Sequence, residues 1–132
     1  MILIDTSVWV DLLRGQLGSK EAVRRLPDIV TCGPVVQEIL QGLEEQGFSR
    51  AFQDALLEVP RVEDPLSLEV FLEAAEIYRV GRRKGYTIRS TVDCLVAAIA
   101  MRHDAVVWHK DRDFDAIARF TALRVKRAAS IH

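Results

Sequence analysis

Short, continuous apolar runs alternate with longer amphipathic segments along this chain, and this alternation constrains the fold more than any other feature. A run such as ILI at residues 2–4 is typical of a strand buried on both faces, as in a parallel sheet. A segment such as 92–103 is apolar at helical spacing and follows the capping pair Ser90-Thr91. Strands that alternate with helices predict an α/β fold with a central, mostly parallel sheet of four or five strands flanked by helices. The predicted strands cover residues 2–4, 28–33, 56–62 (a strand or the approach to one), 105–109 and 123–127. The predicted helices cover residues 8–15 (capped by Ser7), 19–26, 34–42, about 47–56, 66–84, 92–103 and 111–120.

Length and charge limit the classes of protein to which the chain can belong. A chain of 132 residues suits one domain, which we expect to span residues 1–132. A net charge of −1 gives no strong overall field, which argues against a passive electrostatic nucleic-acid binder. No apolar run approaches the roughly 20 residues of a membrane helix, and the first residues lack a secretory pattern, so we expect no membrane association and a cytoplasmic location. Cys32 and Cys94 have neither Cys-x-x-Cys nor zinc spacing and are expected to be free thiols.

Several acids stand beside apolar sequence at positions that one edge of such a sheet would bring together. Asp5 ends the first predicted strand, and Asp111 and Asp113 follow the strand AVVWH. The carboxyl ends of parallel strands lie at the same edge of a sheet, where ligand sites form. Glu38 and Asp93 lie near the starts of two predicted helices, each with apolar neighbours.

Each acid taken alone has an ordinary structural interpretation. Asp93 can be a first-turn acid that interacts with the helix dipole, and Glu38 can lie on a solvated helix face. Asp5 can simply precede a capped helix. Taken together, however, these acids would repel one another and raise each other's pKa values unless a cation paired with them. Oxygen ligands suit a hard divalent cation, and the scattered histidines form no zinc-type set, so we expect a Mg²⁺ or Mn²⁺ site.

Four segments stand out along the chain: MILIDTSVWVDLL, PVVQEILQG, TIRSTVDCLVAAIA and VVWHKDRDFDAIA. In this order and spacing, over essentially the whole chain, they resemble the PIN-domain family, and more narrowly the VapC toxins of bacterial toxin–antitoxin pairs. The resemblance implies a single PIN-like domain and a ribonuclease that hydrolyses RNA phosphodiester bonds with Mg²⁺ or Mn²⁺. It also implies a VapB-type antitoxin as a partner, and a homodimer.

The resemblance also assigns the acids residue by residue. Asp5 matches the family's first acid, Glu38 the second and Asp93 the third. Asp111 best matches the more variable fourth acid, and Asp113 of the same motif binds through water or replaces it. Asp5, Glu38, Asp93 and Asp111 are thus the expected catalytic residues, and all five acids are expected metal ligands. Glu38 would bind the metal or accept a proton from the attacking water.

Other residues receive supporting roles. Thr6 or Ser7 resembles the hydroxyl position that steadies the first aspartate in the family. The family often has threonine where this chain has His109, and an imidazole there could donate a hydrogen bond in its place. Arg89 and Arg112, beside the acids in sequence, are the expected RNA-binding residues.

Two other classes of protein are consistent with parts of this pattern. One is a PIN-like module that binds RNA or protein without cutting, which a complete set of acids disfavours. The other is a phosphatase with Asp5 as nucleophile. That chemistry usually needs a second aspartate two residues on, where this chain has Ser7.

Overall fold

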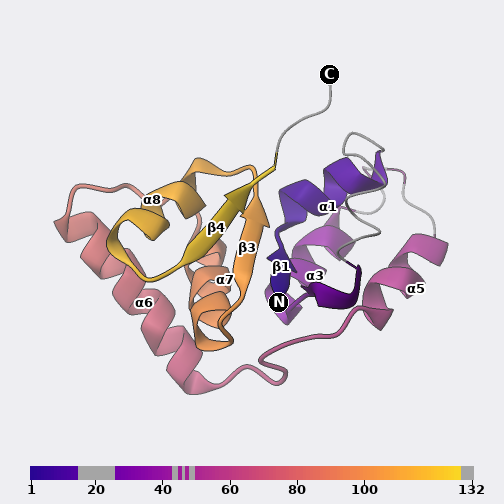
Figure 1. Ribbon diagram of the computed structural model, residues 1–132, viewed down its shortest axis with the longest axis horizontal. Coiled ribbons are helices and arrows are strands. Elements are labelled where there is room, and N and C mark those ends of the chain that lie inside the picture. Colours follow the sequence, from indigo (N-terminus) through magenta and orange to yellow (C-terminus); the bar gives the residue numbers. More distant parts are fainter. Residues whose placement is uncertain (15–25, 43–44, 46, 48–49, 129–132) are drawn as a thin grey trace.

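The computed structural model describes residues 1–14, 26–42, 45, 47 and 50–128, and it has a parallel sheet between helices (Figure 1). Within these residues the strands are β1 (Ile2–Ile4), β2 (Ile29–Val30), β3 (Val106–His109) and β4 (Arg124–Arg127). They lie in the order β2-β1-β3-β4, and each neighbouring pair is parallel. The helices are α1 (Thr6–Leu13), the 3-10 helix η1 (Leu26–Asp28), α3 (Gly33–Gln41), α5 (Arg50–Glu58), α6 (Leu68–Arg83), α7 (Thr91–Arg102) and α8 (Arg112–Phe120). The predicted fold class is therefore confirmed.

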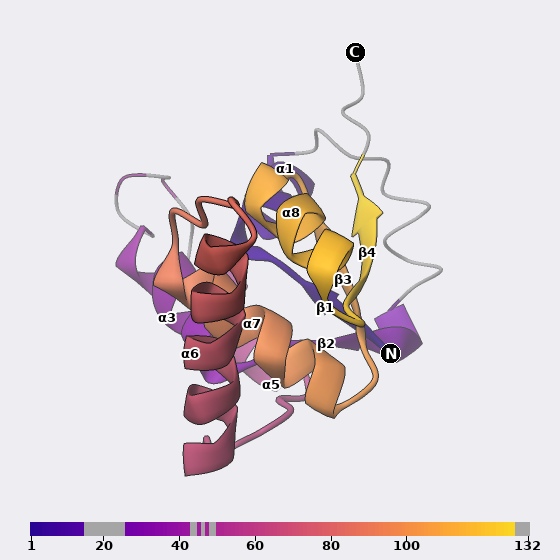
Figure 2. The ribbon, with the colours of Figure 1, turned by 90° about the vertical axis from the view of Figure 1, so that its left-hand side faces the viewer.

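Both faces of the sheet are buried, because successive strand side chains alternate between two apolar clusters. Leu3 and Val107 belong to the larger cluster, to which α3, α6, α7 and α8 contribute. Ile4 and Trp108 belong to the smaller cluster on the other face, together with Val8 of α1. In Figure 1, α6, α7 and α8 lie to the left of the central strands and α1, α3 and α5 to the right. Figure 2 shows the same strands from the side of α6 and α7. None of the helices in the described part of the chain has the length and apolarity needed to cross a membrane.

Two local predictions are wrong. Residues 56–62 are not a strand: α5 continues through Glu58, and only an isolated parallel bridge joins Thr31 to Arg61. The cap of α1 is Asp5, and Ser7 lies inside the first turn, where its hydroxyl donates to Asp5 Oδ2 at 3.0 Å. Residues 19–25 of the predicted helix 19–26 and part of the predicted helix 47–56 lie outside the described residues. The two cysteines are free and buried, as expected.

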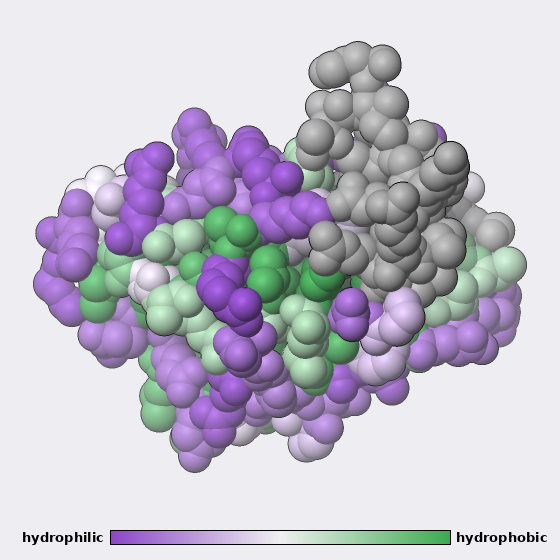
Figure 3. All heavy atoms as spheres, in the orientation of Figure 1, coloured by the Kyte–Doolittle hydropathy of each residue, from purple (hydrophilic) through white to green (hydrophobic). Residues whose placement is uncertain are grey.

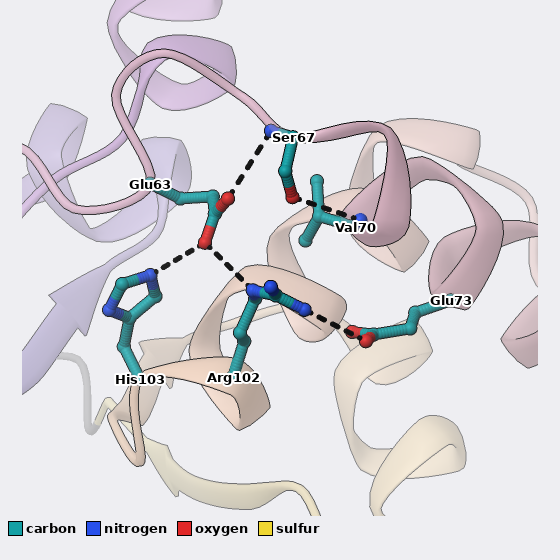
Figure 4. Close-up of polar contacts among 6 residues, drawn as sticks. All are labelled: Glu63, Ser67, Val70, Glu73, Arg102 and His103. Carbon is teal, nitrogen blue, oxygen red and sulfur yellow. Dashed lines mark hydrogen bonds and ion pairs between the residues drawn. The ribbon is translucent and has the colours of Figure 1, made fainter.

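Glu63 fastens the loop between α5 and α6 to the end of α7 (Figure 4). Its Oε1 lies 2.8 Å from His103 Nε2 and 3.1 Å from Arg102 Nε, and its Oε2 accepts the Ser67 N–H at 3.2 Å. Arg102 also donates to Glu73 of α6 at 3.2 Å. The contact with His103, first of all, and those with Ser67 and Arg102 lower the pKa of Glu63. This network connects α6 to α7, the helix that carries Asp93.

Candidate metal centre

The acids predicted from the sequence lie close enough to form a cluster or to shift one another's pKa values. Asp5 and Asp111 follow β1 and β3, which are the two central strands of the sheet (Figure 1). The chain leaves β1 for β2 on one side and β3 lies on the other, so the edge at the carboxyl ends of these strands is where the strand order reverses and where ligands bind in such sheets. Asp5 directly follows β1, and its N–H donates to Trp108 O at 3.0 Å. Asp111 follows β3 by two residues and caps α8.

Asp93, Asp111 and Asp113 form a tight group, which we name the acid cluster. One carboxylate oxygen of each lies within 4.8 Å of the others. Asp93 belongs to the first turn of α7, where its N–H donates to the capping Ser90 Oγ at 3.3 Å. Asp111 Oδ1 accepts the Asp113 N–H at 2.9 Å, which fixes both late acids at the start of α8. The acid cluster thus lies where the first turns of α7 and α8 meet.

Asp93 supplies the observation that distinguishes this cluster from solvated surface acids. Its side chain is only 5% exposed, and its Oδ2 is fully buried without a hydrogen-bond partner in the described part of the chain. Burial first, then the charges of Asp5 and Asp111, a side-chain contact with Asp111, and the charge of Asp113 raise its pKa to about 9. An ionised carboxylate is tolerated at such a place only with a compensating cation. The all-oxygen donor set therefore fits a hard divalent ion such as Mg²⁺ or Mn²⁺.

Asp5 and Glu38 flank the acid cluster rather than belong to it. The pKa of Asp5, which is 5% exposed, is raised by burial and by the charge of Asp111, against the lowering effect of its hydrogen bond from Ser7. Thr6 Oγ1 donates to Glu38 Oε1 at 3.3 Å. Burial and then the charge of Asp5 raise the pKa of Glu38. The five acids thus act on one another electrostatically. Ser7 contacts Asp5, the first aspartate, whereas Thr6, the other hydroxyl considered for that role, contacts Glu38 instead.

His109 supports the site in a way that differs from expectation. Its imidazole was expected to donate, but its Nδ1 accepts the Asp111 N–H at 3.0 Å. Nδ1 is therefore unprotonated, and a neutral ring carries its proton on Nε2, 3.2 Å from Asp115 Oδ1. Burial lowers the pKa of His109, which keeps the ring neutral. The ring thereby anchors the backbone of Asp111.

Asp113 performs a second task besides joining the acid cluster. Its Oδ2 accepts the N–H groups of Arg89 at 3.0 Å and Ser90 at 3.2 Å, so one carboxylate oxygen holds the loop that leads into α7. Charge-assisted bonds of this kind are stronger than neutral ones. The position of Arg89 therefore depends on Asp113.

Three charged residues near the site were not predicted. Buried Asp11 of α1 pairs with Lys110, which directly precedes Asp111. Arg119 joins Arg89 and Arg112 in lining a cavity of about 570 Å³ next to the acids. The sequence held a signal for two of them. Asp11 is a charged residue inside the apolar stretch VWVDLL, and Arg119 lies seven residues after Arg112, on the same helix face.

Comparison with known proteins gives a consistent picture. Residues 2–120 match the family described as PIN domain. Ribonuclease VapC11 of Mycobacterium tuberculosis is 42% identical over 132 residues, which cover 94% of this chain and 96% of that protein. VapBC-1 from nontypeable Haemophilus influenzae has a chain with a TM-score of 0.71 and 18% identity, with 96% of this chain and 98% of that chain covered. VapBC-5 of Mycobacterium tuberculosis, a member of the VapBC family of toxin-antitoxin systems, has a chain with a TM-score of 0.72 and 20% identity, with 96% and 97% covered.

Proposed function

The chain belongs to the PIN-domain family and, within it, to the VapC proteins, and from this premise we propose that it is a metal-dependent ribonuclease that acts as the toxin of a toxin–antitoxin pair. The substrate would be RNA, and the bond hydrolysed a phosphodiester. We propose further that residues 1–132 form one nuclease domain. The single observation that carries the proposal is the buried, unpartnered oxygen of Asp93 in the acid cluster.

Asp93, Asp111 and Asp113 would hold the ion, with Asp5 and Glu38 completing the site. A bound Mg²⁺ or Mn²⁺ would polarise the attacking water and offset the charge that develops on the phosphate. Glu38 would accept a proton from the attacking water; burial and the charge of Asp5, which raise its pKa above the ordinary carboxylate value, support this role. Ser7 and Thr6 would hold Asp5 and Glu38 in position through their hydroxyl contacts.

The partners follow from the relatives and their complexes. The 42% identical relative is named a VapC ribonuclease, and solved chains of the same fold come from VapBC assemblies. We propose that a VapB-type antitoxin inhibits this chain, that the chain forms a homodimer, and that it works in the cytoplasm. Co-expression with the antitoxin should suppress the toxicity that the chain causes when expressed alone.

Incubation of the purified protein with total RNA tests the activity. We expect cleavage with Mn²⁺ and none with EDTA, and no detectable cleavage by Asp93→Asn. Asp104→Asn is the matched control, because Asp104 has a 92% exposed side chain and pairs with Arg124 at the opposite end of the sheet. A wild-type protein that binds RNA but leaves it intact under all metal conditions would instead identify a binding module.

A further inference from the structure

Three arginines line one cavity beside the acid cluster, and we propose that this cavity binds an RNA phosphate next to the one that is cut. We name it the arginine pocket; Arg89, Arg112 and Arg119 line its volume of about 570 Å³. Asp113 belongs both to its wall and to the acid cluster, so the two sites adjoin. This inference rests on the proposed ribonuclease function and adds the residues that would position the substrate.

Asp115, which lies between Arg112 and Arg119 in α8, does not neutralise the positive charges of the arginine pocket. Arg112, Asp115 and Arg119 lie three and four residues apart on α8, a spacing that normally produces ion pairs along one helix face. Asp115, however, pairs with Arg127 of β4 and lies beside the imidazole of His109. The pairing with another strand leaves both arginines of α8 available for an external anion.

Several basic residues elsewhere are paired with acids. Arg79 and Arg83 of α6 both pair with Glu76. Arg102 pairs with Glu63 and Glu73. In the described ranges, Arg89, Arg112 and Arg119 share no ion pair with any of these acids. In Figure 3, hydrophilic side chains lie along the upper edge of the molecule above α8, and hydrophobic ones lie beside them.

The wall opposite α8 is held in place before any ligand binds. Asp113 accepts the backbone N–H groups of Arg89 and Ser90 at one end of the 85–90 loop. At the other end, the Tyr86 ring stacks on Phe120 of α8 with centroids 5.3 Å apart. Gly85 (φ +86°) makes the turn out of α6 in a conformation that favours glycine. A preformed cationic pocket loses less entropy on binding than a mobile arginine would. Three guanidinium groups around one cavity favour phosphate as the group recognised here, because their N–H groups match phosphate oxygens in charge and geometry.

Arg112→Gln and Arg119→Gln test the proposal, with Arg124→Gln as the control. Arg124 starts β4 at the opposite end of the sheet, so its replacement removes the same charge away from the pocket. The probe is a short, labelled, single-stranded RNA of mixed sequence. We expect each pocket variant to raise the KM for cleavage about fivefold, with kcat nearly unchanged. The slope of log KM against log salt should fall by about 0.7 for each lost phosphate contact. The Mn²⁺-induced shift in melting temperature should stay as in wild type, which separates RNA positioning from metal binding.

Affinity for the same RNA, measured in the Asp93→Asn background, separates failure of this inference from failure of the proposed function. If wild-type protein cuts RNA while Arg112→Gln and Arg119→Gln behave like Arg124→Gln in KM, affinity and salt slope, the pocket does not bind substrate. If wild-type protein cuts no RNA but the pocket variants bind it more weakly, the catalytic proposal fails and the phosphate site stands.

Discussion

Replacement of Asp93 by asparagine should stabilise the metal-free protein, although it removes a residue proposed for catalysis. Burial, followed by the charges of Asp5, Asp111 and Asp113, raises the pKa of Asp93 from 3.8 to about 9. Between these values the folded protein holds a proton that the unfolded chain has released. Stability therefore falls as pH rises through this window, by about 1.4 kcal/mol per pH unit at most. Asparagine resembles the protonated acid in shape and does not titrate, so the variant avoids this loss.

The effect is best measured between about pH 7 and about pH 8.5. His109, whose pKa is lowered, is largely neutral there in both the folded and unfolded states, and the thiols of Cys32 and Cys94, raised to about 11, stay protonated in the fold. Over this interval of pH, the titration of Asp93 lowers the free energy of unfolding by about 2 kcal/mol at most. For a domain of this size, that corresponds to about 6–10 °C in Tm.

Thermal unfolding of the two proteins in EDTA, followed by circular dichroism, provides the assay. The wild-type Tm should fall across the interval, and the Tm of Asp93→Asn should fall much less and end higher. Saturating Mn²⁺ should then raise the wild-type Tm by mass action and leave the variant almost unchanged. Asp104→Asn should follow wild type throughout. Equal pH slopes for wild type and Asp93→Asn, or equal Mn²⁺ shifts, would refute the electrostatic argument.

Two further predictions concern residues around the site. Ser7→Ala removes the 3.0 Å hydrogen bond to Asp5 and should weaken Mn²⁺ binding about tenfold. Thr6→Val removes the 3.3 Å contact with Glu38 and should weaken Mn²⁺ binding less. Isothermal titration calorimetry measures both affinities, and a larger effect of Thr6→Val would contradict this order. Glu63→Gln should lower the Tm at neutral pH more than Glu73→Gln does, because Glu63 contacts both Arg102 and His103, whereas Glu73 contacts Arg102 alone. Since the pKa of Glu63 is lowered, its contribution to stability is present above the ordinary value of 4.5 and is lost as pH falls below it. The Tm values of the two variants should therefore differ less in acid. A difference in Tm that persists there would argue against an ionic origin.

The sequence predicts the elements that end at the site because local pattern determines them. The ILI run before Asp5 and the VVWH run before Asp111 are buried strands in the structure, and their parallel pairing brings both acids to one edge. The prediction for residues 56–62 is wrong because the same apolar residues fit a strand and the buried side of a helix end, and α5 extends through Glu58 with Leu56 buried.

Contacts between distant residues could not be predicted, because they depend on how finished elements pack. Asp113 reaches the N–H of Arg89, 24 residues earlier, and Lys110 reaches Asp11, 99 residues earlier. The acceptor role of His109 also required the position of the Asp111 backbone. Residue type indicates which groups carry charge, but packing decides which of these charges remain unpaired.

Because Asp113 lies in both the acid cluster and the wall of the arginine pocket, the two places are thermodynamically linked. Any divalent ion near its carboxylate reduces the negative potential that a neighbouring polyanion meets. Coupling free energies are reciprocal. If the ion raises the affinity for the polyanion by some factor, the polyanion raises the affinity for the ion by the same factor. An enzyme built as proposed would gain its full ion affinity only once nucleic acid is in place, which would restrain it in the absence of a target.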